Sequence, residues 1–139
     1  MKTRFIINPI SGTGKQIGIE HYISKKFDNY DLYFTEHSGH AKILAKQAVC
    51  ENINLLVIIG GDGTINECLE PLVNSNTILF TIPCGSGNGF AKHLAINTNI
   101  IKALTSIKDS SIKLVDVGYV NNKQFINVAG IGFDAHIAK

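Results

Sequence analysis

The chain has 139 residues, of which 45% are hydrophobic and 17% are charged, and its formal net charge is +2. That length suits one domain, and the composition excludes a disordered chain. Lysines and arginines are scattered, which argues against a nucleic-acid partner. The longest apolar run, residues 55–59, is too short to cross a bilayer. The three cysteines have no metal-binding spacing, so we expect a cytoplasmic protein in which each is a small buried side chain.

Apolar, β-branched runs alternate with helical patterns along most of the chain. The expected strands cover residues 4–8, 31–35, 54–60 and 77–83, and each precedes a polar or glycine-rich turn. Apolar residues at helical spacing predict helices between these strands, then a short helix at about 90–94 and another at 100–107. This alternation predicts an α/β fold, in which a mostly parallel sheet has helices on both faces and residues 54–60 form a central strand.

The pattern changes after residue 107. Two strand-like segments, residues 112–120 and 123–133, meet at Asn121 and Asn122, which predicts an antiparallel hairpin. The pattern then stops with no closing helix, so we expect the chain to be a fragment of a longer protein.

Three glycine-rich turns follow the first, third and fourth expected strands. They read NPISGTGK (8–15), GGDGTINE (60–67) and CGSGNG (84–89). In open α/β sheets the carboxyl ends of the strands meet at one edge, where ligands bind. Glycines there let backbone N–H groups approach phosphate oxygens. The same turns offer one cation, Lys15, and several hydroxyls that can bind phosphate or cap helices: Ser11, Thr13, Thr64 and Ser86.

Standard nucleotide motifs do not explain these turns. A Walker A motif is absent, because Gln16 follows Lys15 and Pro9 stands where an upstream glycine is required. Gly130-x-Gly132-x-x-Ala135 matches the dinucleotide fingerprint, but the chain ends four residues later, so no βαβ unit can follow it. We dismiss that match.

Asp62 is the most informative residue of these turns. A carboxylate beside bare backbone amides would compete with an anionic ligand unless a metal bridges the two, as Mg²⁺ does in phosphoryl transfer. Asp62 could instead accept a hydroxyl proton as a general base. The alternative is that Asp62 caps a helix beginning near Thr64. Three glycines among four residues favour a functional role over capping.

Six motifs in order resemble the catalytic domain of the diacylglycerol kinase and sphingosine kinase superfamily. GGDG alone is shared with NAD kinases and phosphofructokinases, but the ordered set is specific and covers nearly the whole chain. The motifs are NPISGTG (8–14), TEHSGHA (35–41), GGDGTINE (60–67), PCGSGNGFAKHL (83–94), VDVG (115–118) and GIGFDA (130–135).

The resemblance implies a lipid kinase that moves the γ-phosphoryl of ATP to a lipid hydroxyl with Mg²⁺. Asp62 would be the catalytic carboxylate, and Asp62 with Asp116 would hold the metal, in a charge network that includes Lys15. Glu67 would contact the ribose or support its loop. The implied nucleotide-binding residues are Asn8, Pro9, Ile10, Ser11, Gly12, Lys15, Thr35, Gly60, Gly61, Asp62, Gly63, Thr64, Ile65, Asn66, Glu67, Gly85, Ser86, Gly87 and Asn88.

Two departures from the family pattern matter. Many bacterial members carry aspartate where this chain has Gly89. The family also has a β-rich C-terminal domain, so residues 1–139 would be the nucleotide-binding catalytic domain without that second domain. The resemblance implies a cytoplasmic protein that touches the membrane surface peripherally and transiently to reach its lipid substrate, and a homodimer is compatible with it.

Two other functions stay open from the sequence. One is a soluble kinase similar to NAD kinases, although the residues around 35–41 and 84–90 favour the lipid branch. The other is a nucleotide-binding module that is inactive without its second domain. His37 and His40 could reach phosphate or adenine, but loop histidines are usually solvated.

Overall fold

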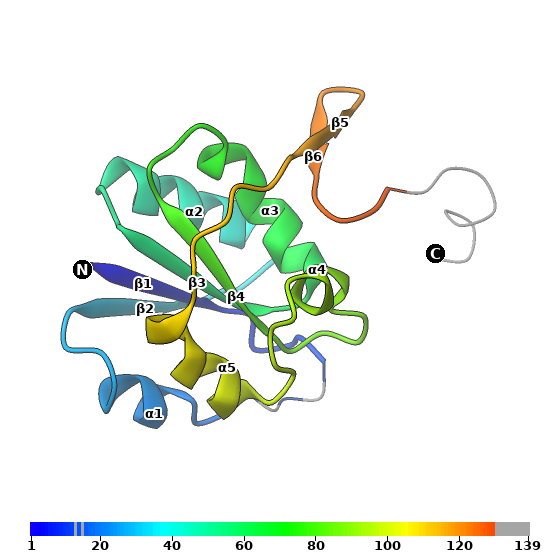
Figure 1. Ribbon diagram of the computed structural model, residues 1–139. Coiled ribbons are helices and arrows are strands. Elements are labelled where there is room, and N and C mark those ends of the chain that lie inside the picture. Colours follow the sequence, from blue (N-terminus) through cyan, green and yellow to red (C-terminus); the bar gives the residue numbers. More distant parts are fainter. Residues whose placement is uncertain (13, 15, 130–139) are drawn as a thin grey trace.

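A parallel sheet lies between two layers of helices, and a small strand pair lies beyond them (Figure 1). The structure is a computed structural model that describes residues 1–12, 14 and 16–129. In chain order the elements are β1 (Thr3–Ile7), α1 (Glu20–Ser24), β2 (Tyr30–Phe34), α2 (His40–Cys50), β3 (Leu55–Gly60), α3 (Asp62–Leu72), β4 (Ile78–Pro83), α4 (Gly89–His93), α5 (Ile100–Ser106), the 3₁₀ helix η1 (Ile107–Asp109), β5 (Gly118–Val120) and β6 (Lys123–Phe125). The predicted α/β class is confirmed.

The four strands of the sheet are all parallel, in the order β2-β1-β3-β4. Every residue of β1 and of β3 is buried, as expected for strands covered on both faces. The sequence therefore predicted the central position of β3 correctly. At the carboxyl edge, Ile7 pairs with both Phe34 and Ile59, and Gly60 pairs with Pro83.

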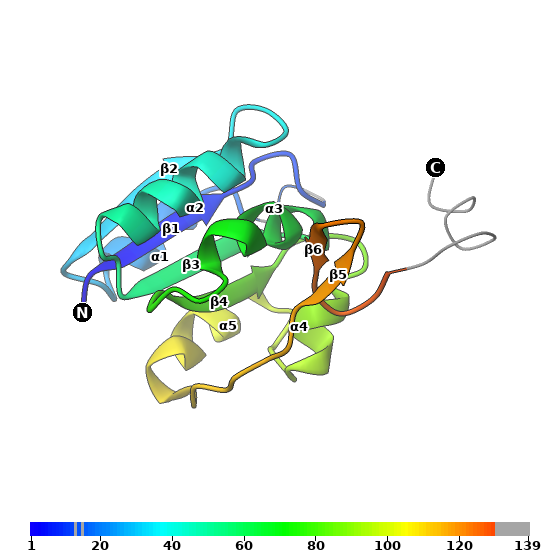
Figure 2. The same ribbon diagram turned by 90° about the horizontal axis from the view of Figure 1, so that it is seen from above.

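Alternate residues of β1, β3 and β4 enter two separate apolar cores. Phe5 and Ile7 of β1 pack with residues of α1 and α5, whereas Ile6 packs with residues of α2 and α3. Figure 2 shows the same two helical layers from above. The sheet is therefore held rigidly from both sides, and the loops at its carboxyl edge start from fixed positions.

The C-terminal hairpin is shorter than predicted. Asn121 and Asn122 both have left-handed backbone conformations, with φ of 48° and 61°, as a two-residue type I′ turn requires. Only three residues pair on each side, because the extended residues 112–117 have no strand partner in the described part of the chain. The predicted strand end at residues 130–133 lies outside the described residues. The hairpin is tied to α3, since the Ile126 N–H donates to Asn66 Oδ1 at 3.3 Å.

An ion-pair network around the buried Arg4 side chain ties the opposite end of the sheet. The Arg4 side chain is 1% exposed; its Nε and Nη2 donate to the Asp31 carboxylate at 2.8 Å each, and Nη2 also donates to Glu51 at 2.7 Å. These hydrogen bonds, above all the one to Asp31, outweigh burial and raise the pKa of Arg4. The network joins β1, β2 and the end of α2 far from the glycine-rich turns.

The cysteines differ in burial. Cys68 and Cys84 are buried as expected, but Cys50, the last residue of α2, is exposed, so the prediction of burial is wrong there. Cys50 falls on the solvent-facing side of α2. Burial, and to a lesser extent the charge of Glu67, raises the pKa of the Cys68 thiol, which donates to the Ala41 carbonyl at 3.5 Å. The Cys68 thiol therefore stays protonated at neutral pH.

Candidate functional site

The three glycine-rich turns meet at the carboxyl edge of the sheet. The strand order reverses between β1 and β3, and in open α/β sheets the crevice at such a switch point is where ligands bind. Residues 8–12 follow β1, residues 60–67 span the end of β3 and the start of α3, and residues 84–89 follow β4. We call these three segments the glycine loops. The sequence predicted their convergence correctly.

Several glycines of these loops are explained by contact between the loops themselves. A Cβ on Gly61 would lie 3.1 Å from Gly85 Cα, and a Cβ on Gly85 would lie 2.7 Å from Gly61 Cα. A Cβ on Gly12 would overlap the Cys84 carbonyl oxygen. A Cβ on Gly60 would lie 2.9 Å from Thr64 Oγ1. Packing between the loops at Gly12, Gly61 and Gly85, and within one loop at Gly60, therefore accounts for these four glycines without any ligand.

Gly63 is different. It is exposed in the first turn of α3, and a Cβ there would meet nothing within 4 Å. Glycine within a helix is less stable than alanine by roughly 0.5–1 kcal/mol. No packing contact within the described chain compensates for this loss. Gly63 follows Asp62 directly, so it leaves open backbone beside that carboxylate. The glycine loops contain one other carboxylate, Glu67.

Asp62 does not cap its own helix. Gly61 is the N-cap of α3 and Asp62 is its first residue, so the alternative in which Asp62 caps a helix near Thr64 is wrong. The carboxylate instead reaches across to the start of α4, where it accepts the N–H of Gly89 at 2.8 Å and the N–H of Phe90 at 3.2 Å. Asp62 therefore holds the loop after β4 against the loop after β3. Each carboxylate oxygen keeps further lone pairs for a metal or a proton.

Asn8 and Thr64 join the loop after β1 to α3. The Asn8 Nδ2 donates to Thr64 Oγ1 at 3.0 Å, and Asn8 Oδ1 accepts the Ile10 N–H at 3.2 Å. Thr64 is 6% exposed, so its hydroxyl serves this internal contact rather than standing in solvent. The loop after β4 is closed in a similar way, because Asn88 Oδ1 accepts the Gly85 N–H at 2.8 Å and Asn88 Nδ2 donates to the Gly85 carbonyl at 2.6 Å.

Asn127 belongs to this region although no sequence motif indicated it. A Cβ on Gly89 would overlap Asn127 Nδ2 and would lie 3.7 Å from Asp62 Oδ2. The Asn127 amide thus occupies the space that a side chain at position 89 would enter. Only the folded hairpin brings residue 127 to this position, so no local pattern could have revealed it.

The contact between Gly89 and Asn127 predicts coupling between the two positions. Gly89→Ala should lower the free energy of unfolding by about 1–3 kcal/mol, because the added methyl overlaps the Asn127 amide. Asn127→Gly in the same chain should recover most of that loss, as measured by urea denaturation of both single variants and the double variant. Additive effects in this cycle would contradict the contact.

The other predicted site residues differ in how deeply they are buried and in what they contact. Ile65 is 1% exposed in the apolar core, so its side chain does not line the site, a correction to the sequence-based set. Thr35 lies at the end of β2, where its N–H donates to the Ile7 carbonyl at 2.8 Å, and Glu67 accepts from Ser38 Oγ at 3.5 Å. Pro9, Ile10, Ser86 and Gly87 are exposed at the loop surfaces, and Ser11 is half-buried. Thr13, Lys15 and the motif at 130–135 lie outside the described residues.

Asp116 is exposed in the extended segment before β5. Among the described residues no group of three or more histidine, cysteine, aspartate or glutamate side chains is arranged to hold a metal. Asp62 is therefore the one carboxylate that the structure places between glycine loops, and the pairing of Asp62 with Asp116 stays a prediction.

His37 and His40 stack on each other with ring centroids 4.9 Å apart, and His40 Nδ1 accepts the Glu36 N–H at 3.1 Å.

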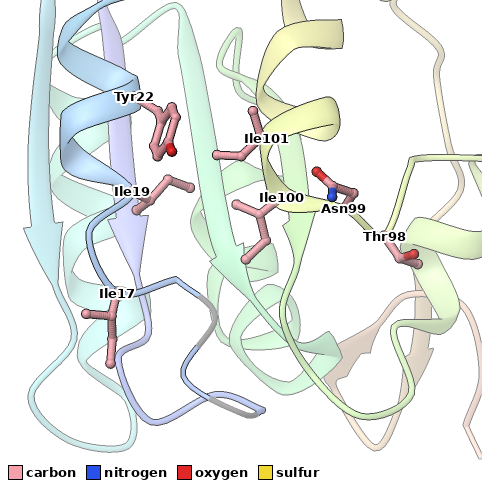
Figure 3. Close-up of a pocket in the computed structure, with 7 residues that line it drawn as sticks. All are labelled: Ile17, Ile19, Tyr22, Thr98, Asn99, Ile100 and Ile101. Atoms are coloured by element: carbon pink, nitrogen blue, oxygen red, sulfur yellow. The ribbon is translucent and has the colours of Figure 1, made fainter.

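A pocket lies away from the glycine loops. It has a volume of about 350 Å³ and opens between α1 and α5, with side chains of both helices directed into it (Figure 3). Apolar and polar side chains both line it: Ile17, Ile19, Tyr22, Thr98, Asn99, Ile100 and Ile101. None of the predicted site residues that the structure describes lines this pocket. Over the part of the chain that the structure describes, the helices are too short or too polar to span a bilayer.

A parallel α/β domain whose glycine-rich loops meet at the switch point defines a class that binds ligands at the carboxyl edge of the sheet. Residues 2–120 match the diacylglycerol kinase catalytic domain. The chain belongs to that family.

Individual relatives agree with this assignment. A diacylglycerol kinase of Bacillus subtilis is 37% identical over 141 residues, covering 94% of this chain and 46% of the relative. One from Staphylococcus carnosus is 32% identical over 137 residues, covering 94% and 45%. A crystal structure of a diacylglycerol kinase from Bacillus anthracis superposes with a TM-score of 0.81 at 29% identity, over 91% of this chain and 48% of that one. The chain thus spans about half the length of these relatives.

Proposed function

We propose that this chain is the nucleotide-binding part of an ATP-dependent lipid kinase. It would transfer the γ-phosphoryl of ATP to the hydroxyl of a lipid alcohol such as diacylglycerol or a sphingoid base. Family membership and the names of the relatives support the kinase and its acceptor class. The position proposed for the phosphates rests on Gly63, because no packing contact within the described chain explains its exposed backbone next to Asp62.

The residues of the glycine loops suit this reaction in separate roles. The backbone N–H groups of Gly12, Gly61 and Gly63 would bind phosphate oxygens, since no Cβ blocks the approach at these three positions. Asp62 would accept the proton of the attacking hydroxyl while the new O–P bond forms and ADP leaves. The loop after β4 holds Asp62 in place through its two N–H donors.

Mg²⁺ fits this set of donors. The ion prefers oxygen ligands, keeps several waters and needs only one or two carboxylates in addition to phosphate oxygens. Asp62 supplies one carboxylate, and Asp116 is the candidate for a second. Bound there, Mg²⁺ would neutralise charge on the phosphates. The protein would act from the cytoplasm and would touch the membrane surface only transiently.

Gly63→Ala tests the position of the phosphates. The substitution should raise the free energy of unfolding by up to about 1 kcal/mol, because alanine favours a helix and meets no neighbour. The same variant should bind ATP about tenfold more weakly or worse, because the methyl group blocks approach to the backbone. Calorimetric titration with ATP and Mg²⁺ and urea denaturation measure the two effects. Unchanged ATP affinity in a more stable variant would place the phosphates elsewhere.

A transfer assay on the full-length protein tests the acceptor. Labelled ATP is offered with dispersed diacylglycerol, with a sphingoid base and with NAD in separate reactions. Label on either lipid supports the proposal. Label appearing on NAD alone would show a soluble kinase instead, and ATP binding without transfer to any acceptor would show a binding module.

A further inference from the structure

Gln16 is buried beneath the loop that follows β1. Its side chain lies in a turn before α1 and is 2% exposed, which is rare for glutamine. Its Nε2 donates to three backbone carbonyls of that loop: Asn8 at 2.9 Å, Pro9 at 2.9 Å and Ser11 at 3.0 Å. One side-chain amide therefore gathers three carbonyl oxygens from four consecutive residues.

The orientation of this amide is fixed by chemistry. A carbonyl oxygen only accepts hydrogen bonds, so the NH₂ group must face the three carbonyls, and the flipped amide would set four oxygens against each other. Gln16 Oε1 then points away from the loop, and it is buried without a hydrogen-bond partner among the described residues. A buried acceptor without a donor destabilises the folded chain. An apolar side chain of the same size would avoid this loss but could not bind the carbonyls.

A carbonyl that points toward Gln16 directs the N–H of the same peptide bond away from Gln16. In a trans peptide the C=O and the following N–H point in opposite directions. The Ser11 carbonyl points at Gln16, so the N–H of Gly12 points away from it. The N–H of Ile10, which follows the Pro9 carbonyl, already donates to Asn8 Oδ1 at 3.2 Å. Gly12 adds a left-handed conformation, with φ of +62°, as in backbone nests that bind anions. The loop therefore turns three carbonyl oxygens inward and leaves the N–H of Gly12 on its outer side.

We propose that Gln16 is a positioning residue that holds the loop of residues 8–12 in a phosphate-binding conformation. This inference rests on the proposed function, because it assigns the outward amide hydrogen of Gly12 to a phosphate of ATP. The lysine-serine or lysine-threonine pair of a Walker A motif is absent here. Here the buried Gln16 amide instead holds the loop from its inner side and does not contact the nucleotide.

Two variants test the role of Gln16. Gln16→Glu keeps the shape but sets a carboxylate against three carbonyls, and Gln16→Met keeps the buried volume and removes the donor. Both should bind ATP with Mg²⁺ about tenfold more weakly or worse, whereas the affinity for adenosine, measured by competition with ATP, should stay within about twofold. The matched control is Gln47→Glu on the exposed side of α2, which should leave both affinities unchanged.

Each outcome separates this inference from the proposed function. If the wild-type protein binds ATP and both variants bind it equally well, the role of Gln16 is overturned and the proposed function stands. An equal loss of ATP and adenosine affinity would show a general structural role and would also overturn the inference. If the wild-type protein itself does not bind ATP, the proposed function fails, and the inference fails with it.

Discussion

Asp62→Asn should lower the rate of phosphoryl transfer by about 10²–10⁴-fold in the full-length protein, the range that a positioned general base contributes. Asparagine keeps one oxygen but puts an NH₂ group where the second carboxylate oxygen lies. That group faces either the Gly89 N–H or the Phe90 N–H, which Asp62 accepts at 2.8 and 3.2 Å. The variant should therefore also lose about 1–3 kcal/mol of folding free energy.

The two effects can be separated. Turnover is measured at saturating ATP and lipid, and stability by urea denaturation of the same samples. Asp28→Asn is the matched control, since Asp28 is exposed in the turn before β2 and has no place in the site. If Asp62→Asn loses stability but turns over at the wild-type rate, Asp62 only supports α4 and takes no part in the chemistry.

Gly12→Ala should lower the free energy of unfolding by about 2–5 kcal/mol, because it combines two penalties. A non-glycine residue is strained at φ of +62°, and the new Cβ would overlap the Cys84 carbonyl oxygen. Relief requires the loop after β1 to separate from the loop after β4. We therefore expect ATP affinity to fall together with stability, as measured by urea denaturation and calorimetric titration.

Gly18→Ala isolates the strain from the overlap. Gly18 has φ of +79°, but a Cβ there meets nothing within 4 Å. This control should lose only about 1 kcal/mol and should keep its ATP affinity. Equal losses at both positions would mean that the packing of Gly12 on Cys84 contributes nothing to stability.

The fold was readable from the sequence where local pattern and burial agree. The apolar run of β3 predicted a central buried strand because both of its faces are covered, and Asn121-Asn122 predicted the hairpin because both residues tolerate left-handed conformations. The extent of the strand before that turn was overestimated. A strand also needs a partner, and the partner of residues 112–117 cannot be derived from their own sequence.

The candidate site was readable only in part. Its three glycine loops follow from strand order, so their convergence could be predicted from the sequence. What each residue contacts could not be, because the contacts join distant loops: Asp62 binds α4, and Asn127 reaches Gly89 only through the folded hairpin. In the sequence, Gln16 shows only that a Walker A motif is absent. No pattern around Gln16 indicates that its side chain binds three carbonyls.

The contact of Gly12 with Cys84 has a consequence for folding. It joins the loop after the first strand to the loop after the fourth, across the end of β3. A partly folded chain in which β4 has not yet paired lacks half of the site. A ligand bound to both loops therefore stabilises the entire sheet. It should raise the free energy of global unfolding, and its effect should not be confined to ordering a single loop.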